Sequence, residues 1–70
     1  RNIRFDDMVR LVNAFGFRLV RINGSHHIFV RSDVPELVNL QAVHGQVKPY
    51  QIRQFLDLVE AYDLRLAHEP

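Results

Sequence analysis

The sequence predicts an α+β fold, a two-layer sandwich of order α-β-β-β-α in which two helices cover one face of a three-stranded antiparallel sheet. Three observations support this fold. An apolar stripe at helical spacing lies near the start, a second lies near the end, and a hairpin signal with a further alternating stretch lies between them. With 70 residues, 47% of them hydrophobic, residues 1–70 are expected to form a single domain with one small core.

The first helix is predicted over Phe5 to Phe15. Asp6 and Asp7 fall in its first turn, where carboxylates complement the positive end of the helix dipole. Gly16 is the expected C′ residue, which ends the helix in the left-handed conformation. The apolar residues recur every three or four positions and form one stripe: Phe5, Met8, Leu11, Val12 and Phe15.

The hairpin is predicted around Asn23-Gly24. Asn-Gly between two apolar runs is a strong hairpin signal, because both central positions of a type I′ turn need positive φ. A two-residue loop there gives these pairs: Arg21 with His26, Leu19 with Ile28, and Phe17 with Val30. Directly opposed residues share a face. The core face is therefore predicted to carry Phe17, Leu19, Ile28 and Val30 and to end at Arg21 and His26. The other face is predicted to carry Arg18, Val20, Ile22, Ser25, His27, Phe29 and Arg31.

A turn and a third strand are predicted after the hairpin. Residues 32–36 form the turn, because Pro35 cannot donate to a ladder and Ser and Asp favour local side-chain bonds. Leu37 to Val43 is the predicted strand, antiparallel to the second strand because the connection is short. Its side chains alternate between two faces: Val38, Leu40 and Ala42 on one, and Asn39 and Gln41 on the other.

The last helix is predicted from Pro49 to about Tyr62, after a loop over His44 to Lys48. Proline suits the first helical position, where its missing N–H costs nothing. The expected apolar stripe is Ile52, Phe55, Leu56, Val59 and Tyr62, and the expected polar face is Gln51, Arg53, Gln54, Asp57 and Glu60. Asp63 to Pro70 is expected to be a frayed tail in which Leu64 and Leu66 can still cap the core.

Composition narrows the functional classes. The chain has no cysteine, which excludes disulfides and thiolate zinc sites. No apolar run approaches the ~20 residues that span a bilayer, and no signal-peptide pattern is present, so a cytoplasmic protein without a membrane partner is expected. A net charge of +1 does not by itself predict nucleic-acid binding. The hairpin is nevertheless basic: it carries Arg18, Arg21 and Arg31, and no acid lies between Phe17 and Arg31.

The element order and one motif resemble a known family. Gly16-Phe17 closes the first helix, and Gly24-Ser25-His26-His27-Ile28-Phe29 enters the second strand. In a chain of this length, these features resemble the HicA toxin family over roughly residues 5–62. The resemblance implies a fold like that of double-stranded-RNA-binding domains. It also implies an mRNA interferase, a metal-independent endoribonuclease that cleaves mRNA, inhibits translation and is held inactive by a HicB-like antitoxin covering the site.

By position, the resemblance places the family's catalytic histidine on His26. Histidine suits the removal of a 2′-hydroxyl proton from RNA, because its unperturbed pKa of about 6.5 lies near the working pH. The cross-strand Arg21 is expected to stabilise charge on the phosphoryl oxygens, and no metal ion or other cofactor is predicted. The predicted RNA contacts are Arg21, Gly24, Ser25, His27, Lys48 and Arg53.

Several alternatives remain at this point. A histidine beside a turn can simply fill the sheet rim, and a one-residue slip of register would exchange the faces of His26 and His27. Lys48 and Arg53 can belong to a solvated helix face, and His44 can be a second acid or base or an ordinary loop residue. Two other functions compete: a non-catalytic RNA-binding module, and a protein adaptor that docks through Val20, Ile22 and Phe29 on the open sheet face.

Overall fold

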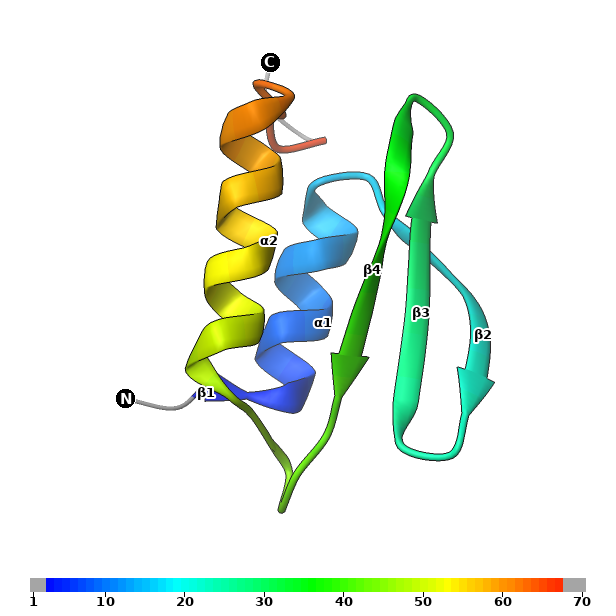
Figure 1. The fold of residues 1–70 in the computed structure, drawn as a ribbon, viewed down its shortest axis with the longest axis vertical. Coiled ribbons are helices and arrows are strands. Elements are labelled where there is room, and N and C mark those ends of the chain that lie inside the picture. The colour runs from blue at the N-terminus through cyan, green and yellow to red at the C-terminus, as the bar shows by residue number, and fades with distance from the viewer. Residues whose placement is uncertain (1–2, 68–70) are drawn as a thin grey trace.

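The computed structural model describes residues 3–67 and confirms the two-layer α+β fold. The elements are β1 (Ile3–Arg4), α1 (Phe5–Ala14), β2 (Arg18–Asn23), β3 (His26–Arg31), β4 (Val34–Gln41), β5 (Gln46–Val47) and α2 (Pro49–Ala61). β2, β3 and β4 form an antiparallel sheet with β3 in the middle. Both helices lie on one face of this sheet, and both begin at the end of the molecule where the β2–β3 turn lies (Figure 1).

The core lies between the helices and the two strands β3 and β4. It is built from Met8 and Val12 of α1 and Phe55 of α2, packed on the sheet residues Phe29, Val38 and Leu40. Phe55 meets Phe15 and Phe17 edge to face, with ring centroids 5.7 Å apart in both pairs. β2 contributes no residue to this cluster, and Leu19, which was predicted to be core, is 45% exposed. The core therefore needs only two of the three strands.

Helix α1 ends as predicted, and an arginine from the sheet supports its end. Gly16 has φ +89°, the left-handed conformation expected of a C′ glycine. Arg31 donates from Nη1 to the carbonyl oxygen of Phe15 at 2.8 Å, and its guanidinium pairs with both carboxylate oxygens of Asp33 at 2.8 and 3.3 Å. A cation at this position complements the negative end of the helix dipole. Arg31 therefore has a structural role.

The connections around β4 differ from the prediction. The turn covers only Ser32 and Asp33, and β4 begins at Val34 and ends at Gln41, two residues before Val43. Pro35 is accommodated because β4 is an edge strand, where a missing ladder N–H is tolerated. The predicted loop also contains β5, which pairs with β1 in a second, two-stranded sheet.

Helix α2 begins at Pro49 as expected, but its faces differ from the predicted ones. Leu56 and Tyr62 of the predicted apolar stripe are exposed, whereas Gln51 of the predicted polar face is only 6% exposed. The burial of Gln51 is compensated because its Oε1 accepts a hydrogen bond from the backbone N–H of Gln41 at the edge of β4. After the helix, Leu64 packs on the core and Leu66 is exposed. The last three residues of the predicted tail lie outside the described residues.

The hairpin loop lies one residue later than predicted, which shifts the partners of β2 by two residues near the turn and by one residue beyond the bulge. Asn23 faces His26 and Arg21 faces Ile28, so the loop consists of Gly24 and Ser25. The pairing shifts at Val20, where β2 carries a bulge. Phe29, which was predicted to lie on the open face, is 1% exposed in the core, because the Phe29 face of β3 packs on the helices. Ile28 is also buried, but it lies on the opposite face of β3 and outside the core cluster.

Candidate functional site

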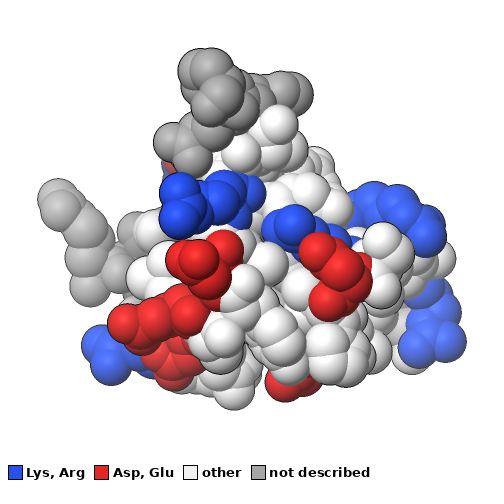
Figure 2. Space-filling view, turned by 90° about the horizontal axis from the view of Figure 1, so that it is seen from above, with Lys and Arg blue, Asp and Glu red and all other residues white. Residues whose placement is uncertain are grey.

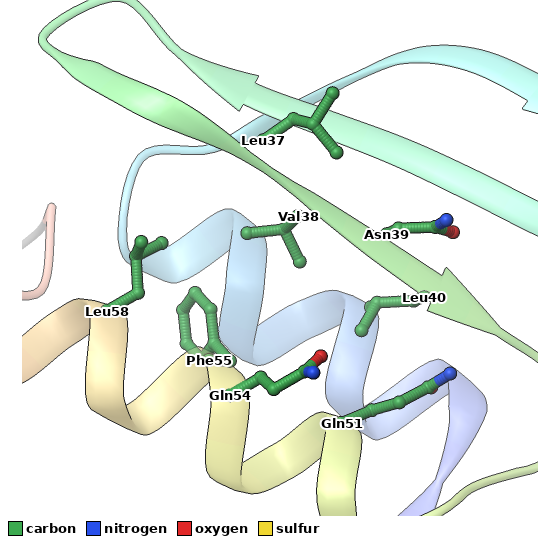
Figure 3. A pocket seen from close by; sticks show the side chains of 8 residues that line it. All are labelled: Leu37, Val38, Asn39, Leu40, Gln51, Gln54, Phe55 and Leu58. Carbon is green, nitrogen blue, oxygen red and sulfur yellow. The ribbon is translucent and has the colours of Figure 1, made fainter.

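The sheet face turned away from the helices carries a group of polar side chains near the β2–β3 turn. His26 lies between Asn23 of β2 and Gln41 of β4, and the next residue on this face, Ile28, lies between Arg21 and Asn39. Figure 3 shows the alternation in β4: Val38 and Leu40 point toward the helices, whereas Leu37 and Asn39 point away. Three strands therefore supply side chains to one exposed surface, which we call the open face.

His26 is an exposed side chain at the centre of this group. Its ring Nδ1 lies 3.1 Å from the amide oxygen Oδ1 of Asn39, so the imidazole is hydrogen-bonded across β3 and β4. The other ring nitrogen, Nε2, makes no hydrogen bond within residues 3–67. An exposed imidazole held by one nitrogen can exchange a proton with a bound molecule through the other.

The β2–β3 turn next to His26 is tied to β4. Gln41 Nε2 donates to Ser25 Oγ at 3.3 Å, and the backbone N–H of Ala42 donates to the Ser25 carbonyl oxygen at 3.4 Å. Gln41 is in turn held by Gln51 of α2, as described above. This chain of hydrogen bonds connects the turn, β4 and α2. Because Ser25 Oγ accepts from Gln41, its own hydroxyl hydrogen remains available to a ligand oxygen.

The bulge at Val20 determines which arginines reach the open face. Residues three apart in a regular strand lie on opposite faces. Here Arg18 pairs with Val30 and Arg21 pairs with Ile28, so the extra residue brings both arginines to the face that carries His26. Neither arginine forms an ion pair within residues 3–67. Arg18 was not among the predicted site residues, because its inclusion depends on the bulge.

The open face carries no acidic side chain among the described residues. Asp33 pairs with Arg31 at the β3–β4 turn, and Glu36 accepts a hydrogen bond from the hydroxyl of Tyr62, the C-cap residue of α2, at 2.6 Å on the helix side of β4. The remaining described acids belong to α1, to α2 and to the turn after α2. Figure 2 shows the end of the molecule opposite the β2–β3 turn. Basic side chains (blue) and acidic side chains (red) are interspersed there, except on the side of β2, where the basic side chains have no acidic neighbours. The near-neutral net charge therefore conceals a basic sheet face.

His27 lies on the other face, which reverses the prediction. Its ring meets Phe5 of α1 edge to face, with centroids 4.7 Å apart, and its Nδ1 lies 3.2 Å from the Ser25 carbonyl oxygen. The sequence pattern predicts His27 on the open face and His26 at the rim of the core face. Strand alternation groups His26 with Ile28 and His27 with Phe29, and the helices pack on the His27 and Phe29 face of β3 instead of the predicted one. His27 therefore packs against the helix layer.

The remaining predicted contacts are not brought to the open face. Lys48 is the N-cap residue of α2 and Arg53 is exposed on α2, so both belong to the helix layer. His44 has φ +53° and lies in the tight turn that joins Val43 to Gln46. Gly24 and Ser25, by contrast, directly precede His26 in the turn. The structure thus brings Arg21, Gly24, Ser25 and His26 to one end of the sheet.

Two residues of this site were missed in the sequence. Asn39 and Gln41 were predicted only as the polar face of the third strand. Their roles follow from the register between β3 and β4, which places them opposite Ile28 and His26. The alternation of the strand indicated their face, but no local signal indicated which β3 residue each would meet.

Within residues 3–67, no three His, Cys, Asp or Glu side chains gather closely enough to hold a metal ion. No helix in this part is long and apolar enough to cross a membrane. A small groove between β4 and α2 is lined by residues that include Gln51, Gln54 and Phe55, and His26 is not among them (Figure 3).

Comparison with known proteins gives one match. A protein-family model described as "HicA toxin of bacterial toxin-antitoxin" matches residues 5–61 of the 70-residue chain. This range includes α1, the whole three-stranded sheet and α2, and therefore every residue of the open face described above. No curated protein and no solved structure matches the chain.

Proposed function

This chain belongs to the HicA toxin family and is the toxin of a toxin–antitoxin system, and from this premise we propose that it is a ribonuclease that cleaves mRNA with His26 as its general base. One observation carries the proposal. The exposed imidazole of His26 shares a face with Arg18 and Arg21, and no described acid lies on that face. Cleavage of mRNA in the cytoplasm stops translation, which accounts for toxicity.

The proposed reaction is an internal attack within the RNA. His26 removes the proton of a 2′-hydroxyl, and the 2′-oxygen forms a bond to the adjacent phosphorus. The bond from phosphorus to the 5′-oxygen of the next nucleotide breaks with its electron pair, and that oxygen takes a proton from water. The products are a 2′,3′-cyclic phosphate and a 5′-hydroxyl, and the proton on His26 returns to solvent. Metal independence is part of this proposal.

Charge stabilisation is assigned to the arginines and the turn. Negative charge gathers on the phosphoryl oxygens in the transition state, and a fixed guanidinium lowers its energy. Arg21 is the nearer candidate in the register, and Arg18 extends the basic surface along β2. Gly24 has no side chain to obstruct a phosphate, and the Ser25 hydroxyl can donate to a phosphate oxygen. His27 is assigned a supporting role through its contact with Phe5.

Lys48 and Arg53 are proposed as contacts only for a longer RNA. They lie at the start of α2, and α2 begins at the same end of the molecule as the β2–β3 turn (Figure 1). An RNA that passes around this end reaches both the open face and the start of α2. An RNA confined to the open face reaches neither residue.

The proposed partner is a HicB-like antitoxin that covers His26. Val20 at the bulge of β2 is 47% exposed and offers an apolar contact beside Arg21, whereas Ile22, 55% exposed, pairs with His27 and lies on the face turned toward the helices. Phe29, which was also predicted for such a contact, is excluded because it is buried in the core. An acidic antitoxin surface would complement Arg18 and Arg21.

The test is an RNA cleavage assay with a chelator present, comparing wild type, His26→Ala and His27→Ala. Loss of a general base typically lowers the rate by about 10²–10⁴-fold, so His26→Ala should abolish detectable cleavage and growth inhibition. His26 is exposed, so its removal leaves no large cavity and the protein should stay folded by circular dichroism. His27→Ala should retain cleavage, with some loss of stability because its ring packs on Phe5.

Three outcomes contradict the proposal in different ways. Full activity of folded His26→Ala removes the histidine mechanism. Loss of activity only in His27→Ala assigns the base to the other histidine. RNA binding without cleavage by wild type freed of antitoxin favours the non-catalytic module.

A further inference from the structure

The hydrogen bond between His26 and Asn39 has a direct chemical consequence. The ring Nδ1 faces the amide oxygen Oδ1 at 3.1 Å. A carbonyl oxygen can only accept a hydrogen bond, so with the Asn39 amide in this orientation the hydrogen is on Nδ1. In neutral imidazole the second nitrogen then carries the lone pair. The contact with Asn39 therefore specifies the tautomer in which Nε2 is the basic atom.

We propose that Asn39 is a positioning residue for His26. Asn39 holds the imidazole in the tautomer and orientation in which the Nε2 lone pair can accept a proton from RNA. It touches no reacting atom and acts only through His26. This inference rests on the proposed ribonuclease function.

The position of Asn39 in the fold suits this role. Asn39 lies on a strand, and strands hold side chains more precisely than loops do. Its neighbours Val38 and Leu40 are buried in the core on the other face of β4. The end of the same strand is tied to α2 through Gln41 and Gln51. The acceptor for His26 is therefore fixed by the core and by α2.

The neutrality of Asn39 matters for the charge of the site. The groups that share the open face with His26 are Arg18 and Arg21 from β2 and the amides of Asn39 and Gln41 from β4. α1 and α2 lie on the other face of the sheet. A carboxylate in place of Asn39 would orient the ring equally well, but it would favour the protonated imidazolium and repel the RNA phosphates. A neutral acceptor orients the base without either effect.

The experiment compares wild type with Asn39→Leu, Asn39→Asp and the control Asn13→Leu. Asn13 is an exposed asparagine on α1, in the opposite layer. Nitrogen-15 NMR of the His26 ring reports which nitrogen carries the hydrogen, and rates measured from pH 5 to 9 report the catalytic base. Nδ1 should be protonated in neutral wild type. Asn39→Leu should lose this preference and lower kcat about 10- to 100-fold with little change in KM, because the base is misplaced while the RNA contacts remain.

Asn39→Asp provides a readout that a merely structural role would not give. It keeps an acceptor for Nδ1, so the tautomer and most of kcat should survive. Its negative charge stabilises the imidazolium, so the acidic limb of the pH–rate profile should shift to higher pH. Asn13→Leu should leave the tautomer, kcat and the pH profile unchanged.

The outcomes separate this inference from the function on which it rests. A wild type that cleaves no RNA overturns both. A wild type that cleaves, together with folded Asn39→Leu that keeps the tautomer or keeps kcat, overturns only the positioning role. An acidic limb that does not move in Asn39→Asp also overturns it.

Discussion

At the scale of single residues, Gly24 sets the position of the β2–β3 turn and so the spacing of Arg21 and His26 on the open face. Gly24 has φ +63° and Ser25 does not have positive φ, which is the pattern of a type II′ turn with glycine at its first central position. This turn places Asn23 opposite His26. A two-residue loop closed one residue earlier would place Arg21 directly opposite His26 instead of opposite Ile28. The turn is therefore part of the candidate site.

Gly24→Val should lower the free energy of unfolding by on the order of 1 kcal/mol or more, because a β-branched residue is strained at positive φ. Steric clash is not the cause, since nothing lies within 4 Å of the position that a Cβ would occupy. Urea denaturation measures the change. Gly24→Asn is the matched control and should cost less, because asparagine is among the residues favoured at the positive-φ positions of such turns. Equal stability of Gly24→Val and wild type would refute the turn assignment.

The sequence predicted positive φ at Gly24 but not the correct turn. Asn23-Gly24 suits a type I′ turn and Gly24-Ser25 suits a type II′ turn, so local turn chemistry does not choose between the two loops. The choice is made by packing across the sheet. Phe29 lies opposite Val38 and fills the core. The bulge at Val20 takes up one extra residue of β2, so that β2 stays paired with β3 on both sides of the bulge. A bulge has no clear local sequence signal, so this part of the site could not be predicted.

At the scale of elements, Tyr62 and Glu36 connect the end of α2 to β4. The Tyr62 hydroxyl donates to Glu36 Oε1 at 2.6 Å. This hydrogen bond raises the pKa of Tyr62 above its usual value of 10.0, and desolvation and the negative charge of Glu36 raise it further. Ionisation of Tyr62 removes the only proton that the pair can share. The contact therefore depends on pH.

The sign of that dependence follows from the raised pKa. Because the folded protein holds the Tyr62 proton more tightly than the unfolded chain, the stabilisation is fully present below pH 10 and is lost as the pH rises through the folded-state pKa. We expect wild type to lose more stability than Tyr62→Phe between pH 9 and pH 12. Urea denaturation across this range measures the difference. Parallel curves for the two proteins would contradict the prediction.

The presence of the two helices could be predicted from the sequence, whereas the exposure of individual side chains could be predicted less well. The apolar stripes correctly predicted α1 and α2 because helical periodicity extends over many residues. Gln51 was assigned to the polar face because the stripe does not include it, yet the unpaired edge of β4 needs its carboxamide. β1 and β5 are two residues each and too short to show alternation. These errors all involve contacts between distant parts of the chain.

At the scale of the whole molecule, charge is segregated in a way that net charge does not reveal. The chain has nine basic and eight acidic residues. Among the described residues, the open face carries Arg18 and Arg21 and no acid, while Arg10 and Arg31 are each paired with an aspartate elsewhere. The field beyond the sheet is therefore positive although the molecule is nearly neutral. Such a surface attracts a polyanion to one side.

This segregation predicts how RNA binding responds to charge and salt. In the His26→Ala background, which binds without cleaving, Arg18→Gln and Arg21→Gln should each weaken binding of single-stranded RNA. The control is Arg10→Gln, because Arg10 pairs with Asp7 at 2.8 Å on α1. RNA binding releases one counterion fewer when one phosphate contact is lost. The slope of the logarithm of the binding constant against the logarithm of the salt concentration should therefore become shallower by roughly 0.7 per arginine. Arg10→Gln should leave the slope unchanged.

The pair of arginines also tests the bulge at Val20. Both side chains lie on the open face only because the bulge inserts one residue between them. If Arg18 and Arg21 contact neighbouring phosphates of one RNA strand, the double variant should lose about twice the slope of each single variant. An unchanged slope in Arg18→Gln with a changed slope in Arg21→Gln would place the RNA near the turn alone. Equal losses in Arg10→Gln would show that the RNA is bound by overall charge and not by the open face.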